Sequence, residues 1–128
     1  MENKYLISHE AFVIAGYAIE AMLCEVAAYP SPGLVSSISK GAHIDMDHYS
    51  FIKSTSALSK YMVLFAQEGY SKRTPKEIFK AIRNIGIEAE EEMFKATKGV
   101  NTHKGMIFLL GISCAADRKS TRLNSSHP

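Results

Sequence analysis

The chain has 128 residues, enough for one domain with its own hydrophobic core. Hydrophobic residues make up 46% and charged residues 22%, which is ordinary for a globular protein, and the formal net charge is +2. Without residues 117–128 the chain holds twelve basic and twelve acidic residues. The rest of the protein is therefore neutral, and its charge gives no reason to expect binding to nucleic acid or to a membrane surface.

The first predicted element is a long helix over residues 5–28. Its apolar residues recur at helical spacing and cover nearly the whole circumference, which is typical of a helix in the middle of a bundle. Glu20 and Glu25 interrupt the apolar run, so a core helix is favoured over a membrane span. Glu25 falls in the last turn, where the helix dipole disfavours an acid. Either a structural partner or a role in a site would explain it.

The stretch that follows, PSPGLVSSISKGAHIDMD at residues 30–47, has no helical periodicity and concentrates special residues. Gly33 and Gly41 suit sharp turns and the close approach of backbone to a ligand. Nitrogen and oxygen ligands then follow at alternate positions: His43, Asp45 and Asp47. We interpret the stretch as a functional loop. An ordinary connection between helices, with a polar residue capping the second one, is the competing interpretation.

Two more helices are predicted downstream. The second helix starts near Asp47 and runs to Glu68, with Gly69 suited to its C-terminal end. The third helix begins at the sequence TPKE (residues 74–77), which joins a capping box to proline at the first helical position, and it ends at Gly99. Gly86 interrupts its core face, which predicts a kink or a close contact with another helix. We expect the acidic run that starts at Glu90 to face solvent for the most part.

The fourth predicted helix starts in VNTHKG (residues 100–105) and has a body that is apolar on all sides. Asn101 or Thr102 can cap it, and His103 and Lys104 fall in its first turn. Free N–H groups and a lysine at a helix N-terminus suit an anion, so we predict an anion site here. A capped helix with a surface lysine is the alternative.

The chain shows no strand pattern and no internal repeat, so we expect an all-α bundle of about four helices. Residues 118–128, RKSTRLNSSHP, lack apolar periodicity and follow the last helix abruptly. We predict that this tail is encoded by a vector or adapter and that the domain spans residues 1–117.

The two cysteines, Cys24 and Cys114, both lie in apolar helical stretches, where buried free thiols are expected rather than a disulfide. Free thiols fit a reducing cytosol, and the polar first ten residues do not look like a secretory signal. We therefore expect a cytoplasmic protein.

Two groups of motifs stand in order along the chain. The first holds EVAA (25–28), PGLV (32–35), GAH (41–43) and DMD (45–47); the second holds Gly86, Ala89-Glu90, Met93, Ala96-Thr97 and GVNTHKG (99–105). Together they resemble the triphosphoribosyl-dephospho-CoA synthase family, over about residues 17–116. Ser31 and Ser36 depart from the lysine and aspartate that the family often has there. Members of the family are longer, so the resemblance implies the N-terminal half of a larger all-α enzyme, with apolar faces exposed where the remainder packs.

The resemblance also implies an activity. In this family the ribose 2′-hydroxyl of 3′-dephospho-CoA displaces adenine from C1′ of ATP, and the product is the prosthetic-group precursor for an acyl carrier protein subunit of citrate lyase or malonate decarboxylase. Such a glycosyl transfer has an oxocarbenium-like transition state. It needs a base for the hydroxyl and a proton or hydrogen bond for departing adenine.

The same resemblance assigns roles to residues. Asp45 and Asp47 are expected to hold Mg²⁺ against the triphosphate, with Glu25 or Glu90 completing its shell or acting as base. His43 is the other candidate base, because its pKa lies near working pH, so the expected catalytic group is His43, Asp45 and Glu25. The expected binding residues for the phosphates and the nucleotide are Gly33, Gly41, Asn101, His103, Lys104 and Gly105.

Two other functions stay open. A histidine and an aspartate at His43 and Asp45 would also suit an all-α metal-dependent phosphohydrolase, but that class needs a second His-Asp pair on a later helix, and none follows His103. A non-enzymatic helical interaction module would leave GAHIDMD and GVNTHKG unexplained. Release of adenine from ATP, dependent on dephospho-CoA, would distinguish the three.

Overall fold

A computed structural model of the chain describes residues 6–27, 48–100 and 102–125, with the backbone alone at 104 and 117–125. Within these ranges the chain is all-α: α1 spans His9–Ala27, α2 His48–Glu68, α3 Pro75–Ala96 and α4 Lys104–Ser125. The predicted class and the four predicted helices are thereby confirmed. Two boundaries differ: α1 begins four residues later than predicted, and α4 continues through the first residues of the predicted tail. The proposed origin of that tail stays a prediction.

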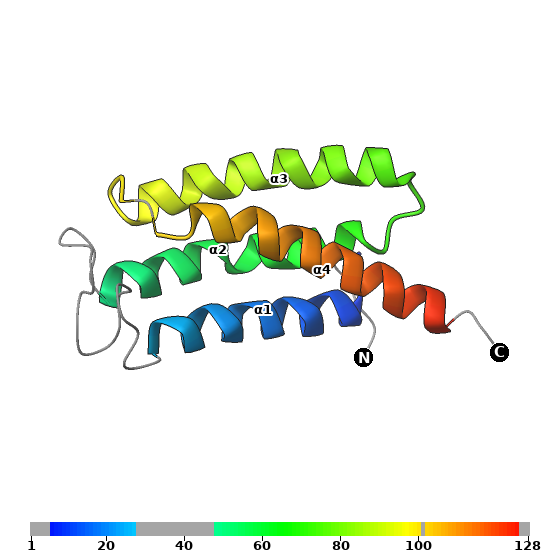
Figure 1. Cartoon of the computed structure of the whole chain (residues 1–128), viewed down its shortest axis with the longest axis horizontal. Helices are drawn as coiled ribbons and strands as arrows, with labels where there is room; N and C mark the ends of the chain where they lie inside the picture. The colour runs from blue at the N-terminus through cyan, green and yellow to red at the C-terminus, as the bar shows by residue number, and fades with distance from the viewer. Residues whose placement is uncertain (1–5, 28–47, 101, 126–128) are drawn as a thin grey trace.

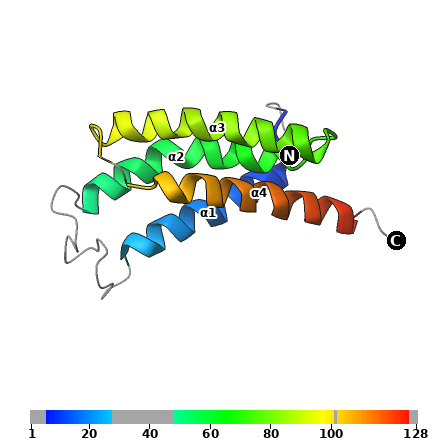
Figure 2. The same ribbon diagram turned by 45° about the horizontal axis from the view of Figure 1, so that its top comes forward.

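The centre of the bundle is α2, which packs against each of the other three helices. Figure 1 shows α1 and α3 on opposite sides of α2, and α4 lying across them; Figure 2 shows the same order after a turn of 45°. The two largest fully buried side chains of the core, Tyr61 and Phe65, come from α2, and so does Leu58. None of the described helices is long and apolar enough to cross a membrane.

The position of α1 corrects one prediction. We expected α1 in the middle of the bundle, but it lies at the side and exposes Phe12, Tyr17 and Leu23. Its inward face consists mainly of small residues: Ala11, Ala15 and Ala18, followed by Met22 and Val26. Small side chains let the α1 backbone lie close to α2, so the bulky residues are turned outward. For the same reason Cys24 is exposed, which corrects the prediction that it is buried, whereas Cys114 is buried as predicted. Neither of these two cysteines forms a disulfide, which confirms that prediction.

The ends of α3 follow the sequence closely. The hydroxyl of Thr74 accepts a hydrogen bond from the backbone N–H of Glu77, and a carboxylate oxygen of Glu77 accepts one from the backbone N–H of Thr74 at 3.1 Å. This is the predicted capping box, with Pro75 as first helical residue. At the other end Gly99 has a φ of 88° and donates its N–H to the carbonyl of Phe94, which turns the chain toward α4.

Two glycines let α4 approach its neighbours. A Cβ added to Gly111 of α4 would lie 2.7 Å from the ring of Phe65 on α2, which is a collision. A Cβ added to Gly86 of α3 would collide with the ring of Phe108 on α4. The close helix contact predicted at Gly86 is therefore present. These two contacts fix how α4 lies on α2 and α3, and with it the position of the first turn of α4.

Candidate functional site

Four helix ends meet at one end of the bundle. Because the helices alternate in direction, the end of α1, the start of α2, the end of α3 and the start of α4 all lie at the left in Figure 1. The starts of α2 and α4 bring free backbone N–H groups and partial positive charge to this end. The connections from α1 to α2 and from α3 to α4 therefore leave and enter the bundle on the same side.

Several predicted site residues fall outside the described residues: Gly33, Gly41, His43, Asp45, Asp47 and Asn101. Of the remaining ones, Glu25 is exposed near the end of α1, Glu90 is half-buried on α3, and Gly105 is exposed in the first turn of α4. Lys104 is the first residue of α4. Among the described residues no three His, Cys, Asp or Glu side chains come close enough to hold a metal ion. The structure thus leaves the predicted magnesium ligands untested.

His103 is the predicted site residue whose surroundings are most completely defined. It lies just before α4, and its side chain is only 3% exposed. The edge of its ring faces Phe51 of α2 with the ring centroids 5.2 Å apart, and its backbone N–H donates to the sulfur of Met93 on α3 at 3.2 Å. Burial lowers the pKa of the imidazole from 6.5 to about 4. At neutral pH His103 is therefore uncharged, and it can contact a phosphate by a hydrogen bond but not as a cation.

A short hydrogen-bonded chain holds the His103 ring. The hydroxyl of Thr102 donates to Oγ of Ser54 at 2.6 Å, and Oγ of Ser54 lies 2.6 Å from Nδ1 of His103. Ser54 sits on α2 and is fully buried. These hydrogen bonds therefore tie the residues just before α4 to the second turn of α2, across 49 residues of sequence.

The hydrogen bond from Thr102 to Ser54 favours one tautomer of the imidazole. Because Ser54 accepts from Thr102, its own proton is available for Nδ1 of His103. A neutral imidazole that accepts at Nδ1 carries its proton at Nε2. Nε2 is buried and has no hydrogen-bond partner among the described residues. An unpaired buried donor costs about 1–3 kcal/mol, so this end of the bundle favours a ligand or chain segment that supplies an acceptor.

Sequence reasoning missed Ser54. The signal was present: Ser54 is a hydroxyl residue at a core-facing position of α2, one turn after Phe51 and one turn before Leu58. A hydroxyl in an apolar stripe needs a hydrogen-bond partner, and a histidine elsewhere in the chain was available. The pairing itself could not be read, because it depends on how α4 lies on α2.

A small cavity lies beside this group, between the last turns of α1 and the first turn of α2. Its volume is about 230 Å³, and five apolar residues line it together with His48. Phe51 forms part of its wall and also packs against the ring of His103. Nδ1 of His48 is buried without a partner among the described residues. The cavity is too apolar to receive a phosphate group, so the polar chemistry of this end is concentrated at His103 and the start of α4.

The model of one protein family, described as ATP:dephospho-CoA triphosphoribosyl transferase (CitG), matches residues 11–127 of the chain. Three relatives are named "Probable 2-(5''-triphosphoribosyl)-3'-dephosphocoenzyme-A synthase". The protein of Vibrio cholerae serotype O1 is 45% identical over 106 residues, that of Lactiplantibacillus plantarum 45% over 106, and that of Streptococcus equi subsp. equi 44% over 105. These matches cover 80–81% of this chain but only 34%, 38% and 36% of the relatives. The chain thus spans little more than a third of their length. No solved structure matches it.

Proposed function

Since the chain belongs to the ATP:dephospho-CoA triphosphoribosyl transferase family, we propose that it forms part of an enzyme that transfers the triphosphoribosyl group of ATP to 3′-dephospho-CoA. The observation that supports this most is the family match over residues 11–127, which includes both motif groups. The arrangement of the bundle is consistent with this proposal, because α1 and α3 end, and α2 and α4 begin, at the same side of the bundle.

The proposed reaction is a displacement at C1′ of the ATP ribose. The 2′-oxygen of dephospho-CoA forms a bond to C1′, the bond from C1′ to N9 of adenine breaks, and the triphosphate stays on the ribose. The proton of the 2′-hydroxyl goes to a base, and adenine leaves with a proton. We place this reaction in the cytoplasm and propose that its product becomes the prosthetic group of an acyl carrier protein subunit, of citrate lyase or malonate decarboxylase.

In this proposal the acidic residues and His43 act either as the base or as ligands of the metal ion. His43 and Glu25 are the candidate bases, and Asp45 and Asp47 with Glu90 would hold Mg²⁺, a cation that prefers carboxylate oxygens. The ion would neutralise charge on the triphosphate. Glu90 alone of these metal ligands lies among the described residues, where it is half-buried.

We assign His103 the role of a neutral hydrogen-bond donor. Its neutral ring, held by Ser54, would donate from Nε2 to an acceptor on the nucleotide. Lys104 and the backbone N–H groups around Gly105 at the start of α4 would supply the positive charge for phosphates.

The direct test uses a chimera in which residues 11–116 replace the matching part of the V. cholerae relative. We expect it to release one adenine per ATP consumed, only when dephospho-CoA is present. His43→Ala should lower turnover by about 100-fold or more if His43 is the base. Ser56→Ala, an exposed change on α2, is the control and should leave turnover unchanged. Release of inorganic phosphate without adenine would instead favour a phosphohydrolase, and neither product would favour an interaction module.

A further inference from the structure

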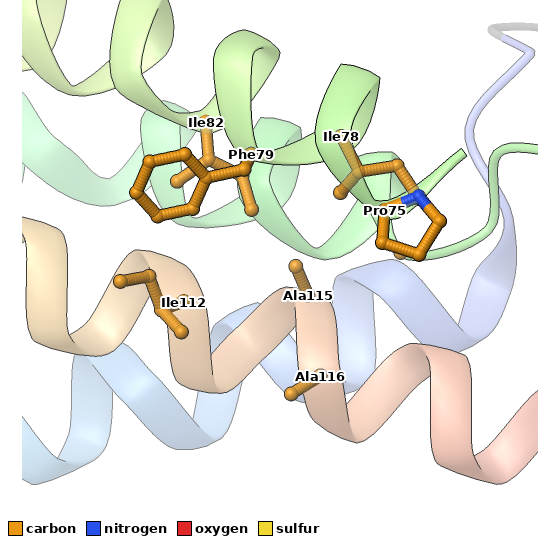
Figure 3. Close-up of a pocket in the computed structure, with 8 residues that line it drawn as sticks. Pro75, Ile78, Phe79, Ile82, Ile112, Ala115 and Ala116 are labelled. Carbon is orange, nitrogen blue, oxygen red and sulfur yellow. The ribbon is translucent and has the colours of Figure 1, made fainter. Parts of the chain in front are cut away.

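An apolar groove lies between α3 and α4, at the end of the bundle away from His103. It has a volume of about 280 Å³, and every residue that lines it is nonpolar. Figure 3 shows Pro75, Phe79 and Ile82 of α3 facing Ile112 and Ala116 of α4 across it. The side chain of Phe79 is 60% exposed and that of Ile112 is 45% exposed. Two large side chains thus border an apolar hollow that water reaches.

The groove continues into the outward face of α4. Leu109, which is 66% exposed, lies one turn before Ile112 on the same face. Residues 105–116 contain no charged side chain. A helix that is apolar on all sides is normally buried, because a solvated face carries charged and polar residues. The composition of α4 therefore fits a helix that is covered on both faces.

The outward face of α3 provides the contrast within the same molecule. Its exposed residues are mostly charged and include Lys80, Arg83 and Glu91, with Ile87 as an isolated exception. Single exposed apolar residues are normal, whereas a contiguous apolar surface with a hollow marks a contact with another polypeptide. The difference assigns a partner to the α4 side of the bundle and none to the outer side of α3.

We propose that the groove and the outward face of α4 form the contact surface for the part of the family's polypeptide that this chain does not match. The chain spans 34–38% of the three relatives, so each of them has a longer unmatched part that must pack somewhere. In this all-α family member the occupant that fits is the apolar face of a helix, with one or two large side chains filling the hollow between Phe79 and Ile112. The proposal rests on the family match and not on the proposed reaction.

The first test compares two proteins, the isolated chain and the chimera with the remainder of the V. cholerae relative. Ile112→Glu should leave the thermal midpoint of the isolated chain nearly unchanged, because the side chain is already half exposed there. In the chimera the same change should lower the midpoint by several degrees, because it places a charge inside a packed contact. The control is Ile87→Glu, at a residue 47% exposed on the outer face of α3, which should leave both midpoints unchanged.

A second test separates this occupant from a second copy of the chain. The 128-residue chain is mixed with the remainder of the V. cholerae relative as a separate polypeptide, and the mass of the complex is measured by light scattering. We expect a one-to-one complex that Ile112→Glu weakens at least tenfold and Ile87→Glu does not. Any of three results would overturn the proposal. The chain could form a homodimer that Ile112→Glu disrupts, or form no complex at all, or Ile112→Glu and Ile87→Glu could shift the thermal midpoint of the chimera equally. Because neither readout is catalytic, an inactive chimera would leave its result intact.

Discussion

The two ends of the bundle depart from the usual burial of apolar residues and exposure of polar ones, each in a different way. At one end Ser54, Thr102 and His103 form a polar group inside the protein, and at the other Phe79 and Ile112 leave an apolar groove in contact with water. A buried polar group and an exposed apolar patch are the informative exceptions to the burial rule. Each calls for something to complete it: a hydrogen-bond acceptor for Nε2 of His103, and a polypeptide for the groove. We therefore propose that a small polar ligand binds at the first end and that a polypeptide packs on the second.

Lowering the pH should reduce the free energy of unfolding through His103 at the polar end, and this is the largest effect that we expect. The pKa of His103 is about 4 in the folded protein and near 6.5 in an unfolded chain. The stability that comes from the neutral ring of His103 is therefore fully present above pH 6.5. It is lost as the pH falls toward 4, which lowers the free energy of unfolding by about 3 kcal/mol in total. The free energy of unfolding, measured in urea from pH 4 to 8, should show this loss. In His103→Asn, which cannot titrate, the loss over that range should be smaller by the same amount; equal pH dependence would contradict the buried neutral ring.

The packing that connects the two ends can be tested at Gly111. Gly111→Ala should destabilise the protein by about 1–3 kcal/mol, because the added methyl group collides with Phe65 and pushes α4 away from α2. The matched control is Gly16→Ala on α1, where nothing lies within 4 Å of the added atom. That change should stabilise the protein by about 0.5–1 kcal/mol, as alanine is the better helix former. Urea unfolding of both variants checks this, and effects of the same sign would argue against the described approach of α4.

The smallest expected effect concerns the start of α3, beside the groove. Thr74→Ala removes the capping box and should cost about 1 kcal/mol in urea unfolding. Ser56→Ala removes another exposed hydroxyl, which bonds only to a carbonyl of its own helix, and should change stability by less than about 0.5 kcal/mol. If Thr74→Ala destabilised the protein no more than Ser56→Ala, the cap would not be needed to hold the wall of the groove in place.

Local signals in the sequence predicted local structure well. The four helices, the capping box at Thr74 and the close contact at Gly86 were all readable, because each depends on residues a few positions apart or on the lack of a side chain. The inward face of α1 was not readable. Its apolar residues surround the helix, and only the neighbouring α2 decides that alanines turn inward and Phe12 and Tyr17 outward.

The candidate site was predictable only in part. His103 and the start of α4 were proposed from the motif, but the burial of His103 and the lowered pKa of its ring could not be predicted, since both depend on how α4 packs. Ser54 carried no motif and emerged only from the contact between α2 and α4. The expected roles of His43, Asp45 and Asp47 lie outside the described residues and stay predictions.

Whether His103 is a neutral hydrogen-bond donor held by Ser54 can be measured by ¹H–¹⁵N NMR of its ring nitrogens. In the 128-residue chain at pH 6 we expect a proton on Nε2 and none on Nδ1, with no titration above about pH 5. Ser54→Ala should mix the two tautomers. A proton found on Nδ1 of the original chain, or a ring that titrates near pH 6.5, would show that His103 is not a buried neutral donor.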